Sequence, residues 1–141
     1  MASKVLIDAN VLLDFTLKRD NYLSARKFFN AIVEKELNGF ITPSILHIVG
    51  HWLTKAYGSA KAKSLLLELL SVITVIDAPY EVMIAALNSR MSDIEDSLQY
   101  YTALHHKMDI FISGNKGLKK SAIASLPVYS LNEVVDELLD N

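Results

Sequence analysis

The chain has 141 residues, of which 51% are hydrophobic and 21% charged, and it contains only 3 Pro and 5 Gly. This composition excludes a disordered, collagen-like or linker-dominated protein, because such chains cannot bury enough apolar surface to offset the entropy of ordering. The absence of cysteine excludes disulfides, thiolate zinc sites, iron–sulfur clusters and cysteine nucleophiles. With 14 basic and 16 acidic residues the net charge is −2, so any nucleic-acid binding must use a local surface.

The apolar stretches are far shorter than the ~20 residues that a membrane-spanning helix needs. The first residues, from Met1 to Lys4, are too few and too polar for a signal peptide. The length corresponds to one domain, at about 100–200 residues per domain. We therefore expect residues 1–141 to form a single cytoplasmic domain that does not associate with a membrane.

Short β-branched runs alternate along the chain with longer stretches of helical character. The short runs predict five strands, over residues 4–7, 40–41, 72–76, 109–112 and 128–129. The spacing of apolar residues and the composition predict helices over residues 22–38, 42–57, 60–70, 80–88, 92–107 and 130–139. The last two helices begin with the S-x-x-E pattern of a capping box, from Ser92 to Glu95 and from Ser130 to Glu133.

This alternation of strands and helices, without a two-residue hairpin signal, favours a mostly parallel sheet covered by helices on both faces. Ligands of such sheets bind beyond the carboxyl ends of the strands. The residues predicted to lie at these ends are Asp8 and Asn10, Asp77, and Ser113 to Gly117. They are therefore the first candidates for a functional site.

The segment after the first predicted strand carries two carboxylates, Asp8 and Asp14, with the carboxamide of Asn10 between them. Hard oxygen ligands of this kind suit Mg²⁺ or Mn²⁺. The alternative is structural: Asp8 or Asn10 caps the following helix, which is a common role for these residue types, and Asp14 is solvated.

Three more acids, Asp93, Glu95 and Asp96, fall in the first turn of the helix predicted over residues 92–107. The positive end of a helix dipole stabilises negative charge there. We expect Glu95 to serve in the capping box and Asp93 to interact with the dipole. Asp96 has neither role, and its position near the apolar side of the helix predicts that it points toward the end of the sheet and is functional.

Three segments, in this order and at this spacing, resemble the PIN-domain nucleases, a family that includes the VapC-type toxins. The segments are Ile-Asp-Ala-Asn-Val-Leu-Leu-Asp at 7–14, Asp-Ile-Glu-Asp-Ser-Leu-Gln-Tyr-Tyr-x-Ala at 93–103 and Asp-Ile-Phe-Ile-Ser-Gly-Asn-Lys at 109–116. The similarity extends over residues 4–139. It implies a three-layer α/β/α fold with a mostly parallel sheet of about five strands. It also implies an acidic cluster at the strand ends that holds Mg²⁺ or Mn²⁺ and hydrolyses RNA phosphodiesters.

The resemblance assigns catalysis and metal binding to two aspartates, Asp8 and Asp96. Further candidate metal ligands are Asp93 and Glu95. Residues expected to support the site are Asn10, Asp14, Ser113 and Asn115. Candidate contacts to the RNA phosphates are Lys116, Lys119 and Lys120, and the alternative for these lysines is a solvated loop.

The sequence departs from the family pattern at two acidic positions. The family has an acid on the helix after the second strand, where this chain has none between Ser44 and Ile48 and His47 is the nearest substitute. The family has another acid after the fourth strand, where this chain has Gly117. We therefore expect one metal ion, held by two aspartates together with waters and a substrate phosphate. The ion would activate water for in-line attack, and the family's precedent implies 5′-phosphate and 3′-hydroxyl products.

The expected partners are RNA and, if the chain is the toxin of a toxin–antitoxin pair, an antitoxin protein. A homodimer is expected from the family's habit and from apolar helices such as residues 64–70. The main alternative is a PIN-like domain that has lost catalysis and binds RNA or protein. A less favoured alternative is a receiver-like regulatory domain that uses its aspartates with Mg²⁺ for phosphoryl chemistry.

Overall fold

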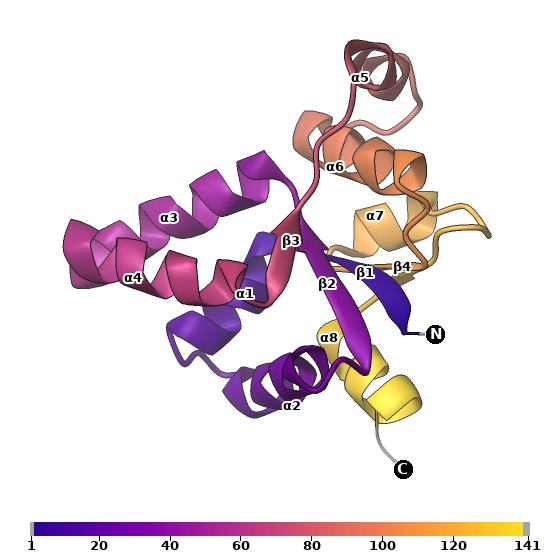
Figure 1. The fold of residues 1–141 in the computed structure, drawn as a ribbon. Coiled ribbons are helices and arrows are strands. Elements are labelled where there is room, and N and C mark those ends of the chain that lie inside the picture. The colour runs from indigo at the N-terminus through magenta and orange to yellow at the C-terminus, as the bar shows by residue number, and fades with distance from the viewer. Residues whose placement is uncertain (1, 140–141) are drawn as a thin grey trace.

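The computed structural model describes residues 2–139, which form a five-stranded sheet flanked by helices (Figure 1). The strands are β1 (Ser3–Ile7), β2 (Leu37–Ile41), β3 (Ile73–Val75), β4 (Ile110–Ile112) and β5 (Val128–Tyr129). The helices are α1 (Ala9–Thr16), α2 (Tyr22–Val33), α3 (Pro43–Tyr57), α4 (Ser59–Leu70), α5 (Tyr80–Leu87), α6 (Ile94–His105), α7 (Lys116–Ser121) and α8 (Leu131–Val134), with a π-helical turn η1 (Val135–Leu139) after α8.

The strand order is β3-β2-β1-β4-β5, and every neighbouring pair is parallel. In the register of the sheet, Val5 of β1 lies opposite Gly39 of β2 on one side and Ile110 of β4 on the other. The carboxyl ends of β1 and β4 therefore lie side by side in the middle of one sheet edge. The predicted parallel sheet with helices on both faces is confirmed.

Successive strand residues point to opposite faces of the sheet, and both faces are buried. In β1, Val5 and Ile7 belong to the larger of two hydrophobic clusters, whereas Leu6 belongs to the smaller one. β4 divides its side chains in the same way. Two-sided burial explains why the strands are continuous apolar runs in the sequence rather than alternating ones.

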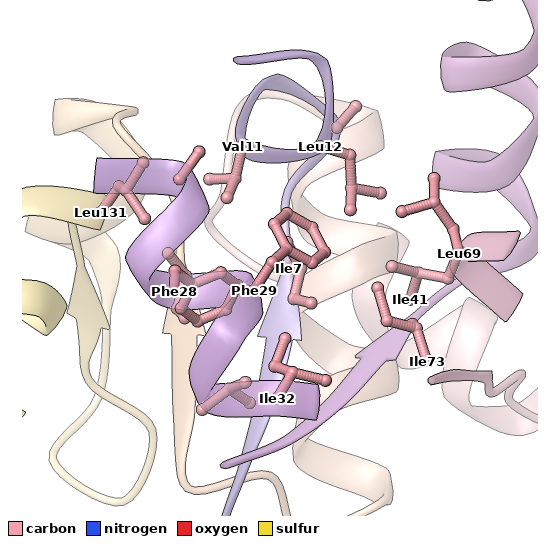
Figure 2. Packing of buried hydrophobic residues seen from close by; sticks show 14 of the residues in the cluster. Ile7, Val11, Leu12, Phe28, Phe29, Ile32, Ile41, Leu69, Ile73 and Leu131 are labelled. Carbon is pink, nitrogen blue, oxygen red and sulfur yellow. The ribbon is translucent and has the colours of Figure 1, made fainter. Parts of the chain in front are cut away.

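The larger cluster lies between the sheet and α1, α2, α3, α4 and α8. Figure 2 shows Phe28 and Ile32 of α2 in this cluster with Ile7 and Ile41 of the sheet. The smaller cluster lies on the other face, under α6 and α7, and includes Tyr100. α5 packs on α6, on the side away from the sheet (Figure 1). No helix within residues 2–139 has the length and apolarity that crossing a membrane requires.

Two helices, α1 and α7, were assigned no residue range from the sequence, and a helix at α1 was considered only as the one that Asp8 or Asn10 would cap. α1 has eight residues, and its buried side chains include the consecutive Val11, Leu12 and Leu13, so its sequence shows no helical spacing. α7 has six residues and buries Leu118. α2 ends at Val33 instead of near residue 38, because Lys35 adopts a positive φ of 62° that leads the chain into β2.

The capping box from Ser130 to Glu133 is present. The capping box from Ser92 to Glu95 was a wrong prediction. α6 begins at Ile94, and its N-cap is Asp93, whose side chain accepts a hydrogen bond of 2.9 Å from the backbone N–H of Asp96. Serine and aspartate are both good N-caps, so residue type alone does not decide between neighbouring positions.

Candidate active site

A cleft of about 640 Å³ lies beyond the carboxyl ends of β1 and β4, bordered by the starts of α1, α6 and α8. Five acidic residues line it, namely Asp8, Asp14, Asp93, Glu95 and Asp96. Arg19 is the one basic residue among those that line it. The cleft therefore lies at the sheet edge where parallel α/β proteins bind ligands, and its walls are strongly negative.

Asp8 is the residue that joins β1 to α1, and its backbone and side chain are both fixed. Its N–H donates to the carbonyl of Ile112 in β4 over 3.0 Å. Its Oδ1 accepts from the N–H of Ala9, and its Oδ2 accepts from the hydroxyl of Ser113, which is itself buried. The capping role considered as an alternative is therefore real, and the side chain lines the cleft at the same time.

Asp96 lies in the first turn of α6 and faces Asn115, the residue that caps α7. The Nδ2 of Asn115 donates to Oδ2 of Asp96 over 2.8 Å, and its Oδ1 accepts from the N–H of Leu118. The backbone N–H of Asn115 donates to the hydroxyl of Ser113. Ser113 and Asn115 thus connect Asp8 to Asp96 by a continuous series of hydrogen bonds.

Two aspartates of the cleft, Asp8 and Asp96, have raised pKa values. Burial raises the pKa of Asp8, and the hydrogen bonds from Ser113 and Ala9 only partly oppose this effect. Burial also raises the pKa of Asp96 to about 6, and the negative charges of Asp93, Asp8 and Glu95 add to the increase. A bound cation would relieve this crowding of negative charge.

The donor set fits a hard divalent cation. Asp8 and Asp96 offer carboxylate oxygens, the ligands that Mg²⁺ and Mn²⁺ prefer. Within residues 2–139, no three carboxylate or imidazole side chains converge closely enough to enclose a metal by themselves. The residues therefore fit the Mg²⁺ arrangement in which one or two carboxylates are completed by waters and substrate oxygens.

The other two acids of α6 differ in role from the sequence-based expectation. Asp93 caps the helix and lines the cleft, so it is more than a residue that interacts with the dipole. Glu95 is in no capping box: its Oε1 accepts from Nε2 of Gln99 over 3.4 Å, and it lines the cleft. Both bring negative charge to the site.

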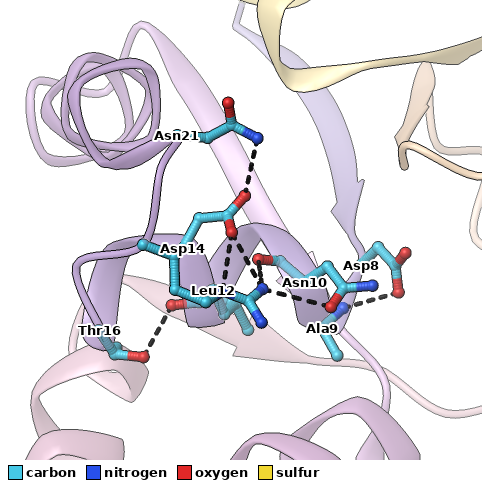
Figure 3. A network of polar contacts seen from close by, with 8 residues as sticks. Asp8, Ala9, Asn10, Leu12, Asp14, Thr16 and Asn21 are labelled. Atoms are coloured by element: carbon cyan, nitrogen blue, oxygen red, sulfur yellow. Dashed lines mark hydrogen bonds and ion pairs between the residues drawn. The ribbon is translucent and has the colours of Figure 1, made fainter.

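Asn10 and Asp14, on α1, make their contacts with an arginine (Figure 3). Asp14 Oδ1 accepts from Nε of Arg19 over 3.0 Å, and Asp14 Oδ2 accepts from Asn21. Asn10 accepts from Nη2 of Arg19 through both its backbone oxygen and its Oδ1. Arg19 and Asn21 were missed by the sequence analysis, because the spacing of five residues between Asp14 and Arg19 is not a helical contact.

The three lysines after β4 lie on α7, so the loop considered for them is a helix. None of them lines the cleft. Lys119 forms an ion pair with Glu133, and this contact lowers the pKa of Glu133. Their expected contact with RNA phosphates stays a prediction.

The two positions where the family's acids are missing remain without a carboxylate in the cleft. His47 is exposed on α3 and does not line the cleft, so it does not replace the acid of that helix here. At Gly117, an added Cβ would lie 3.3 Å from Oδ1 of Asn115. A larger residue there would crowd the side chain that holds Asp96. Asp77 lines a different cavity.

The sequence matches the family model of the PIN domain over residues 4–117, so the chain belongs to the PIN domain family. This confirms the resemblance carried by the three motifs. Comparison of the sequence with curated proteins gives no match.

Solved structures share the fold. A Pyrobaculum aerophilum protein has a TM-score of 0.70 at 19% identity, covering 98% of this chain and 96% of its own. The VapBC2 structure from Rickettsia felis, bound to a promoter DNA fragment, has a TM-score of 0.67 at 15% identity. The match covers 90% of this chain and 98% of that one. VapC20 of Mycobacterium tuberculosis, a sarcin-ricin loop cleaving toxin, has a TM-score of 0.66 at 9% identity. The match covers 87% of this chain and 98% of that one. The fold is therefore that of VapC toxins.

Proposed function

We propose that this chain is a metal-dependent ribonuclease in which Asp8 and Asp96 hold one Mg²⁺ or Mn²⁺ ion at the RNA phosphodiester. The observation that carries the proposal is the hydrogen-bonded series from Asp8 through Ser113 and Asn115 to Asp96, at the floor of an acidic cleft. Membership of the PIN domain family supports the nuclease assignment. The fold of a toxin described as cleaving the sarcin-ricin loop supports RNA as the substrate.

A divalent ion bound at this site would lower the pKa of a water molecule and neutralise charge on the phosphate. Asp8 and Asp96 would hold it, and their side chains are already oriented by Ser113 and Asn115. Such outer hydrogen bonds keep ligating carboxylates in place, so little reorganisation accompanies binding. Asp93 and Glu95 would strengthen the attraction for the cation through their charge.

Cleavage of a mixed, structured RNA pool tests this proposal. Wild-type protein with Mn²⁺ is expected to cleave the RNA and leave 5′-phosphate ends, and Asp8→Asn, prepared identically, is expected to be inactive. Equal cleavage by both proteins would identify a contaminating nuclease. Cleavage by neither, with Mg²⁺ or Mn²⁺, would favour a degenerate PIN domain that binds RNA or protein.

We also propose a cytoplasmic toxin role with an antitoxin partner, supported by the fold shared with VapBC2 and with a toxin–antitoxin complex from Klebsiella pneumoniae. Expression of the wild-type chain is expected to slow host growth, and expression of Asp8→Asn is not. A homodimer is supported by exposed apolar side chains on α4 and α5, where Leu67 is 70% and Tyr80 76% exposed. Sedimentation showing only a 15.7 kDa species at high concentration would contradict the dimer.

A further inference from the structure

Arg19 brings a fixed positive charge into a cleft that is otherwise lined by acids. Its Nε donates to Asp14 Oδ1 over 3.0 Å, and its Nη2 donates to the backbone oxygen of Asn10 over 3.0 Å and to Oδ1 of Asn10 over 3.3 Å. Three acceptor atoms therefore fix one edge of the guanidinium plane. A side chain held in this way loses little further entropy when it binds a ligand.

The segment around Arg19 is built to hold this position. Lys18 adopts a positive φ of 53°, which turns the chain after α1, and the backbone N–H of Arg19 donates to the carbonyl of Asp14 over 3.1 Å. Asn21 Nδ2 approaches the second carboxylate oxygen of Asp14 at 3.5 Å. The aspartate that holds Arg19 is thus itself held, as Figure 3 shows for Asp14 and Asn21.

The remaining edge of the guanidinium is unused. Within the described residues, Nη1 of Arg19 has no hydrogen-bond partner, and the side chain is 40% exposed. The ion pair is only half-exposed, with the Arg19 side chain 40% and the Asp14 side chain 15% exposed, so Arg19 also neutralises a largely buried carboxylate. Arginine offers a planar fork of donors that matches a phosphate group, so the unused edge suits a phosphate oxygen.

An RNA-cleaving site in this cleft needs such a charge. The net charge of the chain is −2, and the lysines of α7 lie outside the lining of the cleft. A polyanionic strand that enters the cleft meets five carboxylates, and the metal ion neutralises only those that it contacts. Contacts to phosphates are what positions a nucleic acid on a protein, and arginine is a principal donor for them.

We propose that Arg19 binds a phosphate group of the RNA strand beside the metal site, and that Asp14 and Asn10 position it. The inference rests on the proposed function, because the ligand is the RNA substrate. It also gives Asn10 and Asp14 a new role. From the sequence, they were expected to support the metal site. Their oxygens orient the arginine.

The test is binding of a fluorescein-labelled single-stranded RNA oligonucleotide, followed by anisotropy over a series of salt concentrations. Ca²⁺ replaces Mn²⁺, and the RNA is checked for integrity after each titration. Arg19→Gln is expected to weaken binding about tenfold and to reduce the slope of log affinity against log salt by about 0.7, the effect of one phosphate contact on a single strand. Arg19→Lys, which keeps the charge without the fork, is expected to lie in between.

The matched control is Arg26→Gln, which removes the same charge from an exposed position on α2 outside the cleft. It is expected to bind RNA as the wild type does. Asp14→Ala, which removes both the carboxylate charge and the acceptor of Arg19 Nε, provides a second test whose expected direction differs between the two explanations. If the cleft acted only through its net charge, removing a carboxylate would tighten RNA binding. If Asp14 positions Arg19, binding weakens.

Mn²⁺ affinity and the melting temperature are measured on the same variants. Arg19→Gln is expected to keep Mn²⁺ binding and to strengthen it slightly, because its contacts do not involve Asp8 or Asp96 and the substitution removes a positive charge from the cleft. Two results would overturn the inference. One is that Arg19→Gln and Arg26→Gln show equal RNA affinity and equal salt slope, and the other is that Arg19→Gln loses Mn²⁺ binding. The proposed function would stand in both cases. If Arg19→Gln does not fold, the RNA affinities of Arg19→Lys and Asp14→Ala decide the question. A wild-type protein that neither binds nor cleaves RNA would overturn both.

Discussion

The side-chain amide of Asn115 donates a hydrogen bond to Oδ2 of Asp96 over 2.8 Å, although Asn115 caps α7 and Asp96 lies in the first turn of α6. The same side chain caps α7 through its Oδ1, which accepts from the N–H of Leu118. A residue with both roles fixes the start of one helix relative to the start of another. The position of Asp96 in the cleft therefore depends on a residue that follows β4.

Replacing Asn115 is expected to separate these two roles. Asn115→Ala removes the cap and the contact with Asp96, so we expect a loss of about 1 kcal/mol in the free energy of unfolding and a decrease of about tenfold in Mn²⁺ affinity. Asn115→Ser is the matched control, because serine can cap the helix but is too short to hold Asp96. It should keep most of the stability but show the same decrease in Mn²⁺ affinity as Asn115→Ala. Wild-type Mn²⁺ affinity in both variants would refute the positioning role.

Metal binding is expected to depend on pH through Asp96. Its carboxyl group, with a pKa of about 6, is protonated below that pH and ionised above it. Mn²⁺ competes with the proton, so protonation of Asp96 should lower the affinity by up to about tenfold per pH unit below pH 6. The raised pKa of Asp8 adds to this fall. Calorimetric titrations of the chain with Mn²⁺ at several pH values measure this dependence. A range from about pH 5 to about pH 7.5 extends one to two units on either side of the pKa of Asp96. An affinity that is constant over this range would contradict the raised pKa.

Without metal, the burial of the Asp96 carboxylate and the negative charges around it are expected to cost stability. The pKa of Asp96 is higher in the folded chain than its ordinary value of 3.8, so the folded state binds more protons between these two values. Stability should therefore fall as the pH rises from about 4 to about 6, and the penalty is complete above that range. Asp96→Asn should stabilise the metal-free protein at neutral pH by about 1 kcal/mol, after allowance for solvent screening.

Urea denaturation in EDTA measures this effect, with Asp93→Asn as the control. Asparagine at position 93 can still cap α6, so that variant tests the removal of one nearby charge without loss of the cap. The gain from Asp96→Asn should disappear toward pH 4, where the wild-type carboxyl is protonated as well. Destabilisation by Asp96→Asn at neutral pH would mean that the acid stabilises the fold by itself.

The sheet and the sites of Asp8 and Asp96 were predictable, because each depends on signals that span a whole element. A buried parallel strand is a continuous apolar run, and its carboxyl end follows at once. α1 and α7 are too short to display helical spacing, so they were missed.

Contacts that depend on the conformation of single residues were not predictable. Arg19 reaches Asp14 because Lys18 adopts a positive φ, which residue type does not indicate. Likewise, the choice of Asp93 over Ser92 as the cap of α6 follows from the path of the chain into the helix. The network around the two aspartates is made largely of such local choices.

Gly39 is expected to be essential for the packing of β2. A Cβ at this position would lie 3.0 Å from Cδ1 of Ile32 and 3.1 Å from Cδ1 of Ile7, both in the larger cluster. Gly39→Ala should therefore lower the free energy of unfolding by about 1–3 kcal/mol through overpacking. In Gly50→Ala the nearest atom, on Leu66, is 3.4 Å away, and the helix gains propensity, so we expect a gain of up to about 1 kcal/mol. Equal effects of both substitutions in thermal denaturation would contradict this packing.

The central claim is that Asp8 and Asp96 together hold one divalent metal ion, and a Mn²⁺ titration of the purified, metal-stripped chain tests it most directly. We expect one Mn²⁺ per chain in the wild type. Asp8→Asn and Asp96→Asn should each abolish binding, and Asp136→Asn, at an exposed acid outside the cleft, should leave it unchanged. Two results would contradict the metal site and the nuclease mechanism that depends on it. One is Mn²⁺ binding by each of the two variants in the cleft, and the other is a wild-type chain that binds no Mn²⁺.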